Sequence, residues 1–382
     1  YLGGLTSAVY NEVLQFFLIV LGILPLVIMG LNKAGGLKGI LHNVDPAKLH
    51  VWKGMAHAST NPMGVDAFSL VFGLGFVLAF GYWCTDFLVV QRAMISRNLN
   101  EAQRTPIIAS IPKLFMPAIV ILPGIILLAL QKQMSGFALP VNASGQTDYN
   151  MALPVLLAKL YPNGILGIGV TALIASFMSG MAGNVTAFNT VFTFDIYQAY
   201  IRKHASEKHY LTVGKLTTVA GILISIATAY IARRFNSIMD LLQLVFSFVN
   251  APLFATFFLG MFWKRTSANG AFYGLISGTA AAALTHGLTT AEGKGGWMMN
   301  LHTFYSGTSQ AFTIAWIAFV VCFAVTGLIS LFSTPQPENS LVGLVYSLTP
   351  KQKDKAKVWY KNPLVLGVIV LITTLLLNIV FY

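Results

Sequence analysis

The chain has 382 residues, of which 56% are hydrophobic and 9% are charged, and its formal net charge is +12. Soluble domains carry about 25% charged residues, so this composition excludes an ordinary soluble protein and indicates an integral membrane protein. The excess of Lys and Arg does not require a nucleic-acid partner, because positive charges retained in cytoplasmic loops give the same balance. Cys84 and Cys322 both lie in apolar stretches, which argues against a disulfide framework or a metal cluster.

Uncharged stretches predict an all-α, polytopic membrane protein with about nine transmembrane helices. A membrane-spanning helix needs roughly 20 predominantly apolar residues. The predicted spans are residues 13–31, 67–85, 114–131, 165–194, 216–232, 241–263, 268–288, 310–331 and 363–382. If the first span starts in the cytoplasm, most Lys and Arg fall on the cytoplasmic side, as the positive-inside rule requires. This orientation predicts that Lys203 and Lys353 are cytoplasmic and that Lys48 and Lys294 are extracytoplasmic.

The segments between the spans differ in character. Two predicted outer loops, 32–66 and 133–162, are long enough to cover a site, and residues 152–160 predict a short surface helix. Residues 333–361 are rich in Pro and Lys and predict a cytoplasmic linker before a final anchor helix. The chain begins without Met, close to a hydrophobic span, so we expect that an N-terminal part of the protein is missing from this sequence.

Three predicted spans contain residues that interrupt helices. The interrupting residues are Gly73, Gly75 and Gly81 in the second span, Pro117 and Pro123-Gly124 in the third, and Pro252, after Asn250, in the sixth. Broken helices at membrane depth are tolerated where the freed backbone faces protein or a cavity, and transporters build binding sites in this way. We therefore expect breaks in these helices.

A stripe of small residues follows the uncharged stretch 160–194. Ala172, Ser176, Ser179 and Gly183 recur at intervals of three or four, so they share one face of a helix. Small residues let helices approach closely in a membrane, which is one interpretation of the stripe. The other is that its hydroxyl oxygens bind a hard cation.

Four segments carry a resemblance to a known family. Residues 82–92 read YWCTDFLVVQR and resemble the YWCTD…QR segment of the sodium–glucose cotransporters. Residues 176–197, SFMSGMAGNVTAFNTVFTFDIY, are similar to the sodium-site helix of that family. The LLQ at 241–243, followed by WKR at 263–265, resembles its sugar-binding helix, and the opening GGLTSAVYNEVLQ resembles a helix with an acidic residue near the inner sodium exit. The chain is therefore identified as a member of the sodium/solute symporter family.

This resemblance implies a LeuT-type fold of two inverted five-helix repeats. Residues 1–265 would form the transporter core, with the last helix of the first repeat and all of the second repeat. Residues 266–382 would form peripheral C-terminal helices, with the cytoplasmic linker at 333–361. The first four core helices, which in the family carry part of the sodium and sugar sites, would then be absent from this sequence.

The resemblance also implies sodium ligands. Ser176, Ser179 and Gly180 match the sodium-ligand positions of the family, although Gly180 stands where serine is usual, so we expect a weakened site. Ala182 and Gly183 stand where some relatives bind a second sodium through hydroxyls, which argues against a second site here. Glu12 matches the acidic residue on the ion exit path; the alternative is an ordinary interfacial residue.

Three further positions match substrate contacts of the family. Tyr82 matches an aromatic inner gate under the sugar, Lys113 a lysine that bonds the sugar, and Gln243 a sugar-binding glutamine. The alternative for Lys113 is snorkelling from the inner interface. Ala79 stands where one sugar-binding member has asparagine, so the substrate contacts differ from those of that member.

We therefore interpret the chain as a sodium-coupled symporter of the plasma membrane that carries a sugar or sugar-like polyol by alternating access. The partners expected are Na+, a small-molecule solute and the lipid bilayer, and no nucleic acid; the sequence does not fix an oligomeric state. The alternatives are a symporter for an organic acid, amino acid or nucleoside, or a sugar-binding sensor or channel-like relative. An enzyme is not expected, because no paired carboxylates or nucleophile–base set occur at membrane depth.

Overall fold

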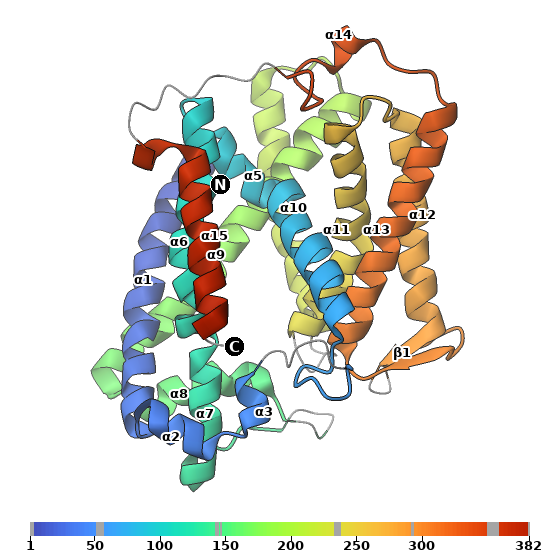
Figure 1. Ribbon diagram of the computed structural model, residues 1–382. Helices are drawn as coiled ribbons and strands as arrows, with labels where there is room; N and C mark the ends of the chain where they lie inside the picture. The colour runs from blue at the N-terminus through green and yellow to red at the C-terminus, as the bar shows by residue number, and fades with distance from the viewer. Residues whose placement is uncertain are drawn as a thin grey trace. The chain divides into compact units, whose positions relative to one another are not determined.

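A computed structural model describes residues 4–50, 57–141, 145, 147–232, 238–291, 294–349 and 359–380. The chain is mostly helical and divides into two compact units (Figure 1). Unit 1 comprises Tyr1–Leu49, Thr105–Ser237 and Val370–Asn378, and unit 2 comprises His50–Arg104, Ile238–Ile369 and Ile379–Tyr382. The predicted division at residue 265 concerns the repeats of the family, and it stays a prediction.

Unit 1 is built around its first long helix. Its longer helices are α1 (Gly4–Lys33), α6 (Leu99–Val120, which begins in unit 2), α7 (Leu122–Gln133), α8 (Ala152–Leu160), α9 (Asn163–Thr190), the π-helix η4 (Val191–Ile201) and α10 (Glu207–Ala232). Shorter elements are α2 (Gly36–Asn43), α3 (Pro46–Leu49), η2 (Ser135–Phe137) and η3 (Tyr149–Met151), and most of α15 (Pro363–Val380) also belongs here.

The core of unit 1 joins α1, α7 and α8. Leu26, Ile126 and Leu157 are among its buried residues. The predicted short helix at 152–160 is present as α8, and it contributes Leu157 to this core rather than lying wholly on the surface. The Tyr161 hydroxyl donates to the carbonyl oxygen of Gly22 at 2.7 Å, which ties the end of α8 to α1.

Unit 2 combines helices with a small sheet. Its helices are the π-helix η1 (Ser69–Phe80), α4 (Gly81–Thr85), α5 (Phe87–Met94), α11 (Ile238–Phe262), α12 (Ala268–Leu288), α13 (Gly307–Phe332), α14 (Glu338–Leu341) and η5 (Trp359–Lys361). In the sheet, β1 (Thr289–Ala291) pairs antiparallel with β2 (Lys294–Gly295) and parallel with β3 (His302–Phe304). Buried aromatic and small residues from η1, α11, α12 and α13, such as Phe254 and Phe312, form one core.

Glycines bring α12 and α13 into close contact. Gly270, Gly274 and Gly278 recur every fourth residue on α12 and are buried. A Cβ atom at Gly278 would stand 2.9 Å from the Ala318 carbonyl oxygen and 3.0 Å from the Pro252 side chain on α11. Small residues on one face of a membrane helix permit this backbone approach. The predicted span 268–288 is therefore a packed helix whose partners are α11 and α13.

The helices of the structure lie at the predicted membrane spans, but several of them begin or end at other residues than predicted. Within the described part of the chain, six helices are long and apolar enough to cross a membrane, and the pair Ser69–Thr85 and Phe87–Met94, bent by 45°, adds a seventh. The third predicted span is the end of a longer helical segment, Leu99–Gln133. Helices also stand at the two remaining predicted spans: α12 is 21 residues long but rich in Gly, Ala and Thr, and α15 is a shorter apolar helix.

The expected breaks at the prolines differ in outcome. The third span is interrupted at Pro123-Gly124, since α6 ends at Val120 and α7 begins at Leu122 with Pro123 in its first turn, whereas Pro117 lies inside α6.

The break expected at Pro252 is wrong, because Pro252 lies inside the continuous α11. A proline removes the hydrogen bond to the carbonyl four residues earlier. At Pro252 that carbonyl belongs to Phe248, and it accepts a hydrogen bond from the Thr279 hydroxyl of α12 at 3.3 Å. The neighbouring helix thus replaces the lost donor, and α11 continues.

The second predicted span does break, although the bend is not at its glycines. Gly73 and Gly75 lie within the π-helix η1, Gly81 is where η1 passes into α4, and the chain bends after Thr85. Asp86 has an extended backbone there, and its carboxylate accepts from the Leu88 N–H at 2.8 Å, which caps α5. The break therefore follows the segment that carries Tyr82.

Candidate functional site

Two predicted substrate residues lie on adjacent helices of unit 2. Tyr82 is on α4, and its ring centroid is 5.4 Å from that of Phe246 on α11, with the planes tilted by 30°. Phe246 follows Gln243 by three residues, so both are on the same side of α11. Tyr82 and Gln243 are both half-buried. Among the described residues, nothing accepts from or donates to the Gln243 amide. This side of α11 thus offers an aromatic ring and an amide whose hydrogen bonds are unused.

A buried polar pair, Thr85 of α4 and Asn250 of α11, lies further along the side of α11 that carries Gln243 and Phe246. The Thr85 hydroxyl donates to the Gly81 carbonyl at 2.7 Å and lies 3.3 Å from the Asn250 amide oxygen. Asn250 is 6% exposed, and its amide nitrogen has no hydrogen-bond partner in the described structure. Buried polar atoms normally have a partner, so this nitrogen marks a place where a water or a ligand atom fits. In the sequence, this site could have been found from an asparagine inside an uncharged span, two residues before Pro252.

The predicted sodium residues lie on α9 in unit 1. Ser176 is exposed and Ser179 is half-buried. In the described structure neither hydroxyl donates within the helix, whereas those of Thr171 and Thr186 donate to carbonyls four residues earlier, at 2.8 and 2.6 Å. A Cβ atom at Gly180 would meet nothing within 4 Å. The two serine hydroxyls thus have no hydrogen-bond partner in the described structure, and hydroxyl oxygens are ligands that a hard cation takes.

The remaining predicted site residues are also in unit 1. Lys113 is an exposed residue of α6, and Glu12 is a half-buried residue of α1. The structure thus brings Tyr82 and Gln243 onto neighbouring helices of unit 2. The grouping of Lys113 with these two residues, and of Glu12 with the sodium ligands, stays a prediction.

Known proteins resemble this chain over most of its length. Residues 1–278 match the sodium:solute symporter family. The chain is 29% identical to the sodium/glucose cotransporter 1 of Sus scrofa over 379 residues, which cover 92% of this chain and 57% of that protein. It is 31% identical to the sodium/mannose cotransporter of Bos taurus over 300 residues, covering 74% and 50% respectively. It is 27% identical to the sodium/myo-inositol cotransporter of Canis lupus familiaris over 375 residues, covering 89% and 51%.

A solved structure shares the fold. A Na+-coupled sialic acid symporter in a substrate-bound, outward-open state superimposes with a TM-score of 0.66 at 22% identity, over 87% of this chain and 64% of that one. This likeness confirms the predicted LeuT-type fold. The chain spans a little over half the length of the sodium/glucose cotransporter 1 of Sus scrofa.

The family match covers nearly three quarters of the chain and agrees with the motifs at 82–92, 176–197 and 241–265. It confirms that sodium is the coupling ion of the family and that the relatives are transporters rather than enzymes. The chain belongs to the sodium:solute symporter family.

Proposed function

We propose that the protein to which this chain belongs carries a sugar or sugar-like polyol across the plasma membrane together with Na+, by alternating access. The observation that supports this most is the side of α11 with Gln243 and Phe246, against which Tyr82 packs. An aromatic face suits the apolar face of a sugar ring, and an amide with unused donors and acceptor suits neighbouring hydroxyls. Relatives named for glucose, mannose and myo-inositol agree with such a solute. Residues 1–265 would supply part of the transporter core.

Sodium would bind at Ser176, Ser179 and the Gly180 turn of α9, with Glu12 on its exit path. Because Ser179 has a hydroxyl with no partner in the described structure, Ser179→Ala should raise the sodium concentration for half-maximal uptake about five-fold, the equivalent of losing one contact of about 1 kcal/mol. Gly180→Ser should lower it, since there is open space for a Cβ.

The matched control is Thr171→Ala on the same helix, whose hydroxyl is already bonded to the Gly167 carbonyl. Uptake should be measured with the full-length protein as sodium is replaced by choline. If uptake is the same in sodium and in choline, the ion coupling is refuted. If Ser179→Ala and Thr171→Ala behave alike, the assignment of the ligand is refuted and the coupling is not.

If the protein is a transporter, the alternative to a neutral sugar is an organic acid. A substitution at Lys113 distinguishes these two classes of solute. Lys113→Gln keeps a hydrogen-bond donor but removes the charge. It should be partly tolerated for a neutral sugar and should nearly abolish binding of an anion, since a charged pair contributes about twice as much as a neutral hydrogen bond. Equilibrium binding of labelled glucose and of an acidic sugar reads both outcomes, with Lys132→Gln at the end of α7 as control. A large loss of glucose affinity together with unchanged anion affinity would contradict the proposal.

The orientation in the membrane has its own test. Lys48→Cys should react with an impermeant maleimide in right-side-out vesicles, and Lys203→Cys should react only after permeabilisation. Both positions are described, whereas Lys353 lies outside the described residues. Reaction at position 203 in sealed vesicles, without reaction at 48, would reverse the topology.

Counterflow distinguishes a carrier from a sensor or channel-like relative. A carrier preloaded with unlabelled sugar should accumulate labelled sugar transiently, because the binding site faces each side in turn. A protein that only binds sugar should show none.

A further inference from the structure

Side-chain contacts hold the short helix α4 against one face of α11, within unit 2. On α11 this face carries Phe246, Asn250 and Phe254, which recur every fourth residue. The Tyr82 ring packs on Phe246. Gly81 lies so close to Phe254 that a Cβ atom on it would stand 2.8 Å from the ring. Asn250 lies between these two apolar contacts and supplies a polar one.

The polar contact joins Asn250 to Thr85. The amide oxygen of Asn250 lies 3.3 Å from the Thr85 hydroxyl, which also donates to the Gly81 carbonyl at 2.7 Å. Apolar contacts have no preferred direction, whereas a hydrogen bond fixes the distance and the orientation of its partners. A single polar residue in an apolar helix interface sets the register of two helices in this way. The pair therefore fixes the position of α4, and of Tyr82 on it, along α11.

The pair lies where α4 ends. In a continuous helix, the N–H of Val89 would bond to the carbonyl of Thr85. Here the Val89 N–H bonds to the Asp86 carbonyl at 3.0 Å, because the backbone at Asp86 is extended. The Thr85 carbonyl has thus lost its helical donor at the point where Asn250 approaches Thr85.

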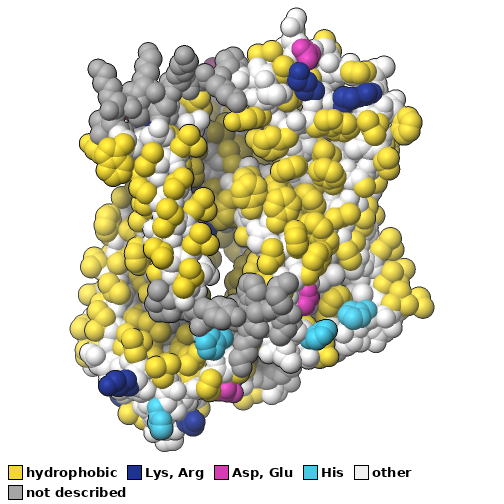
Figure 2. All heavy atoms as spheres, in the orientation of Figure 1, with side chains coloured by type: hydrophobic (Ala, Val, Ile, Leu, Met, Phe, Trp, Pro, Cys, Tyr) yellow, Lys and Arg dark blue, Asp and Glu magenta, His cyan; other side chains and the backbone are white. Residues whose placement is uncertain are grey.

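The amide nitrogen of Asn250 needs an acceptor at the same place. Asn250 is 6% exposed, and its nitrogen has no partner in the part of the chain that the structure describes. Hydrophobic side chains cover most of the face that Figure 2 shows, so polar groups behind such a surface are shielded from bulk water. Nearly all buried amide groups in proteins have a hydrogen-bond partner. One ordered water, bonded to this nitrogen and to a carbonyl at the end of α4, would satisfy both groups.

Asn250 lies apart from the side chains that a sugar would contact. Gln243 and Asn250 are seven residues apart on α11, which is about 10 Å along the helix axis. The packed rings of Tyr82 and Phe246 lie between them. Asn250 therefore affects a sugar at Tyr82 and Gln243 through the position of α4 and not by direct contact.

We propose that Asn250 is a positioning residue for Tyr82. Its amide oxygen fixes α4 through Thr85, and its amide nitrogen holds an ordered water at the broken end of that helix. The inference rests on the proposed function for the contact between Tyr82 and a sugar. The placement of α4 by Asn250 does not depend on which solute is carried, so it has a test of its own.

The reactivity of Cys84 reports the position of α4 without any solute. Cys84 is exposed on α4, whereas Cys322 in the same unit is buried. In the purified full-length protein, Asn250→Leu and Thr85→Val should each raise the rate of modification of Cys84 by N-ethylmaleimide about five-fold, because one hydrogen bond that restrains α4 is lost. Thr85→Ser keeps the hydroxyl and should react like the wild type.

Cys322 is the control for unfolding, and mass spectrometry of each cysteine peptide gives the two rates. Cys322 should stay unmodified in every variant. If Asn250→Leu makes Cys322 reactive, Thr85→Val carries the test, since the same rise at Cys84 is expected from it. A high-resolution structure of the full-length protein should also show a water within about 3 Å of the Asn250 amide nitrogen.

The affinity for solute separates a positioning role from a purely structural one. Asn250→Leu should weaken binding of labelled glucose about five-fold, and Thr85→Ser should leave Kd unchanged. If Asn250 acts through the Tyr82 ring, this loss should disappear in a Tyr82→Leu background, which has no ring to position. It should persist in a Gln243→Glu background, since Gln243 is on another helix than Tyr82.

The outcomes distinguish this role from the proposed function. Unchanged Cys84 rates in both Asn250→Leu and Thr85→Val would overturn the positioning role and leave the proposed function standing. So would a loss of glucose affinity that is as large with Tyr82→Leu as without it. Raised Cys84 rates in a protein that binds no neutral sugar would support the placement of α4 by Asn250 and refute the proposed function. A structure without a water at the amide nitrogen would contradict the second part of the proposal.

Discussion

Gln243→Glu is expected to weaken binding of a neutral sugar by roughly 1–3 kcal/mol, or about 5- to 150-fold in Kd. The substitution keeps the shape of the side chain but removes both N–H donors. Gln243 is half-buried, and in the described structure its amide has no protein partner, so no compensating contact within the fold is lost. The change therefore acts on the ligand, whose hydroxyl oxygens would lose their donors and face a negative charge.

The measurement is equilibrium binding of labelled glucose, galactose and myo-inositol to the purified full-length protein. Ser247→Ala is the matched control on α11, because the Ser247 hydroxyl is buried and donates to the Leu244 carbonyl at 2.7 Å. It should leave Kd nearly unchanged. If the wild type binds none of the neutral sugars, or Gln243→Glu binds them as tightly as wild type, the assignment of sugar as the solute fails.

Gly73→Ala is expected to destabilise the protein by roughly 1–3 kcal/mol, the range for inserting a methyl group into a well-packed interior. A Cβ atom at Gly73 would collide with the backbone carbonyl of Phe312 on α13, and its distance to the carbonyl carbon would be 2.8 Å. Backbone atoms cannot move aside as a side chain can, so η1 would have to separate from α13. The core that holds Phe312 and Phe254 would then lose contacts.

Gly75→Ala provides the control, two residues along the same helix. Its Cβ would approach only the Leu70 carbonyl oxygen, at 3.5 Å, which is ordinary contact. Replacing a helical glycine by alanine without a clash stabilises by about 0.5–1 kcal/mol, so the two variants should differ in sign. Thermal unfolding of the full-length protein in detergent, followed by tryptophan fluorescence and size-exclusion chromatography, compares them. Equal stability of the two variants would show that η1 and α13 do not touch at this point.

The transmembrane organisation was predictable because it depends on long uncharged stretches, which are visible in the sequence. Where each helix continues or breaks was not predictable, because it depends on contacts with neighbouring helices. Pro252 predicted a break in α11, but the Thr279 hydroxyl of α12 satisfies the Phe248 carbonyl that the proline leaves without a donor. Likewise, no residue pattern distinguishes the hydrogen-bond register of the π-helix η1 from that of an ordinary α-helix.

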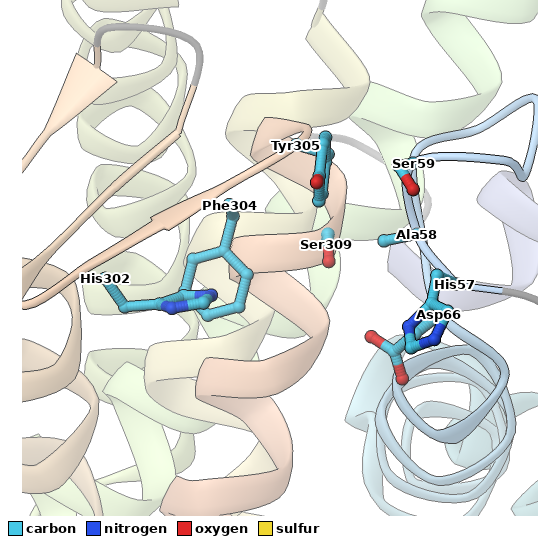
Figure 3. A pocket seen from close by; sticks show the side chains of 8 residues that line it. All are labelled: His57, Ala58, Ser59, Asp66, His302, Phe304, Tyr305 and Ser309. Atoms are coloured by element: carbon cyan, nitrogen blue, oxygen red, sulfur yellow. The ribbon is translucent and has the colours of Figure 1, made fainter.

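The candidate site likewise has a part that was predictable from the sequence and a part that was not. Motifs of the family identified Tyr82 and Gln243, and the packing of α4 on α11 brings their helices together. The unpaired amide nitrogen of Asn250 could not be foreseen, since it depends on which acceptors the folded chain places around it, and Thr85 bonds only to the amide oxygen. The pocket lined by residues of 57–66 and 302–309 (Figure 3) could not be foreseen either, because these two segments meet only in three dimensions.

The glycine-rich α12 has a consequence for biosynthesis. Its Gly270, Gly274 and Gly278 give it close packing against α13, but they also make it too weakly apolar to count as a span by composition, whereas α13 is strongly apolar. The translocon admits a segment to the lipid according to its apolarity. Because only the short segment 289–306 joins the two helices, we expect α12 to enter the bilayer together with α13, as a helical hairpin. A polar substitution in α13 would then lower the yield of inserted protein, because α12 would insert less efficiently although its own sequence is unchanged.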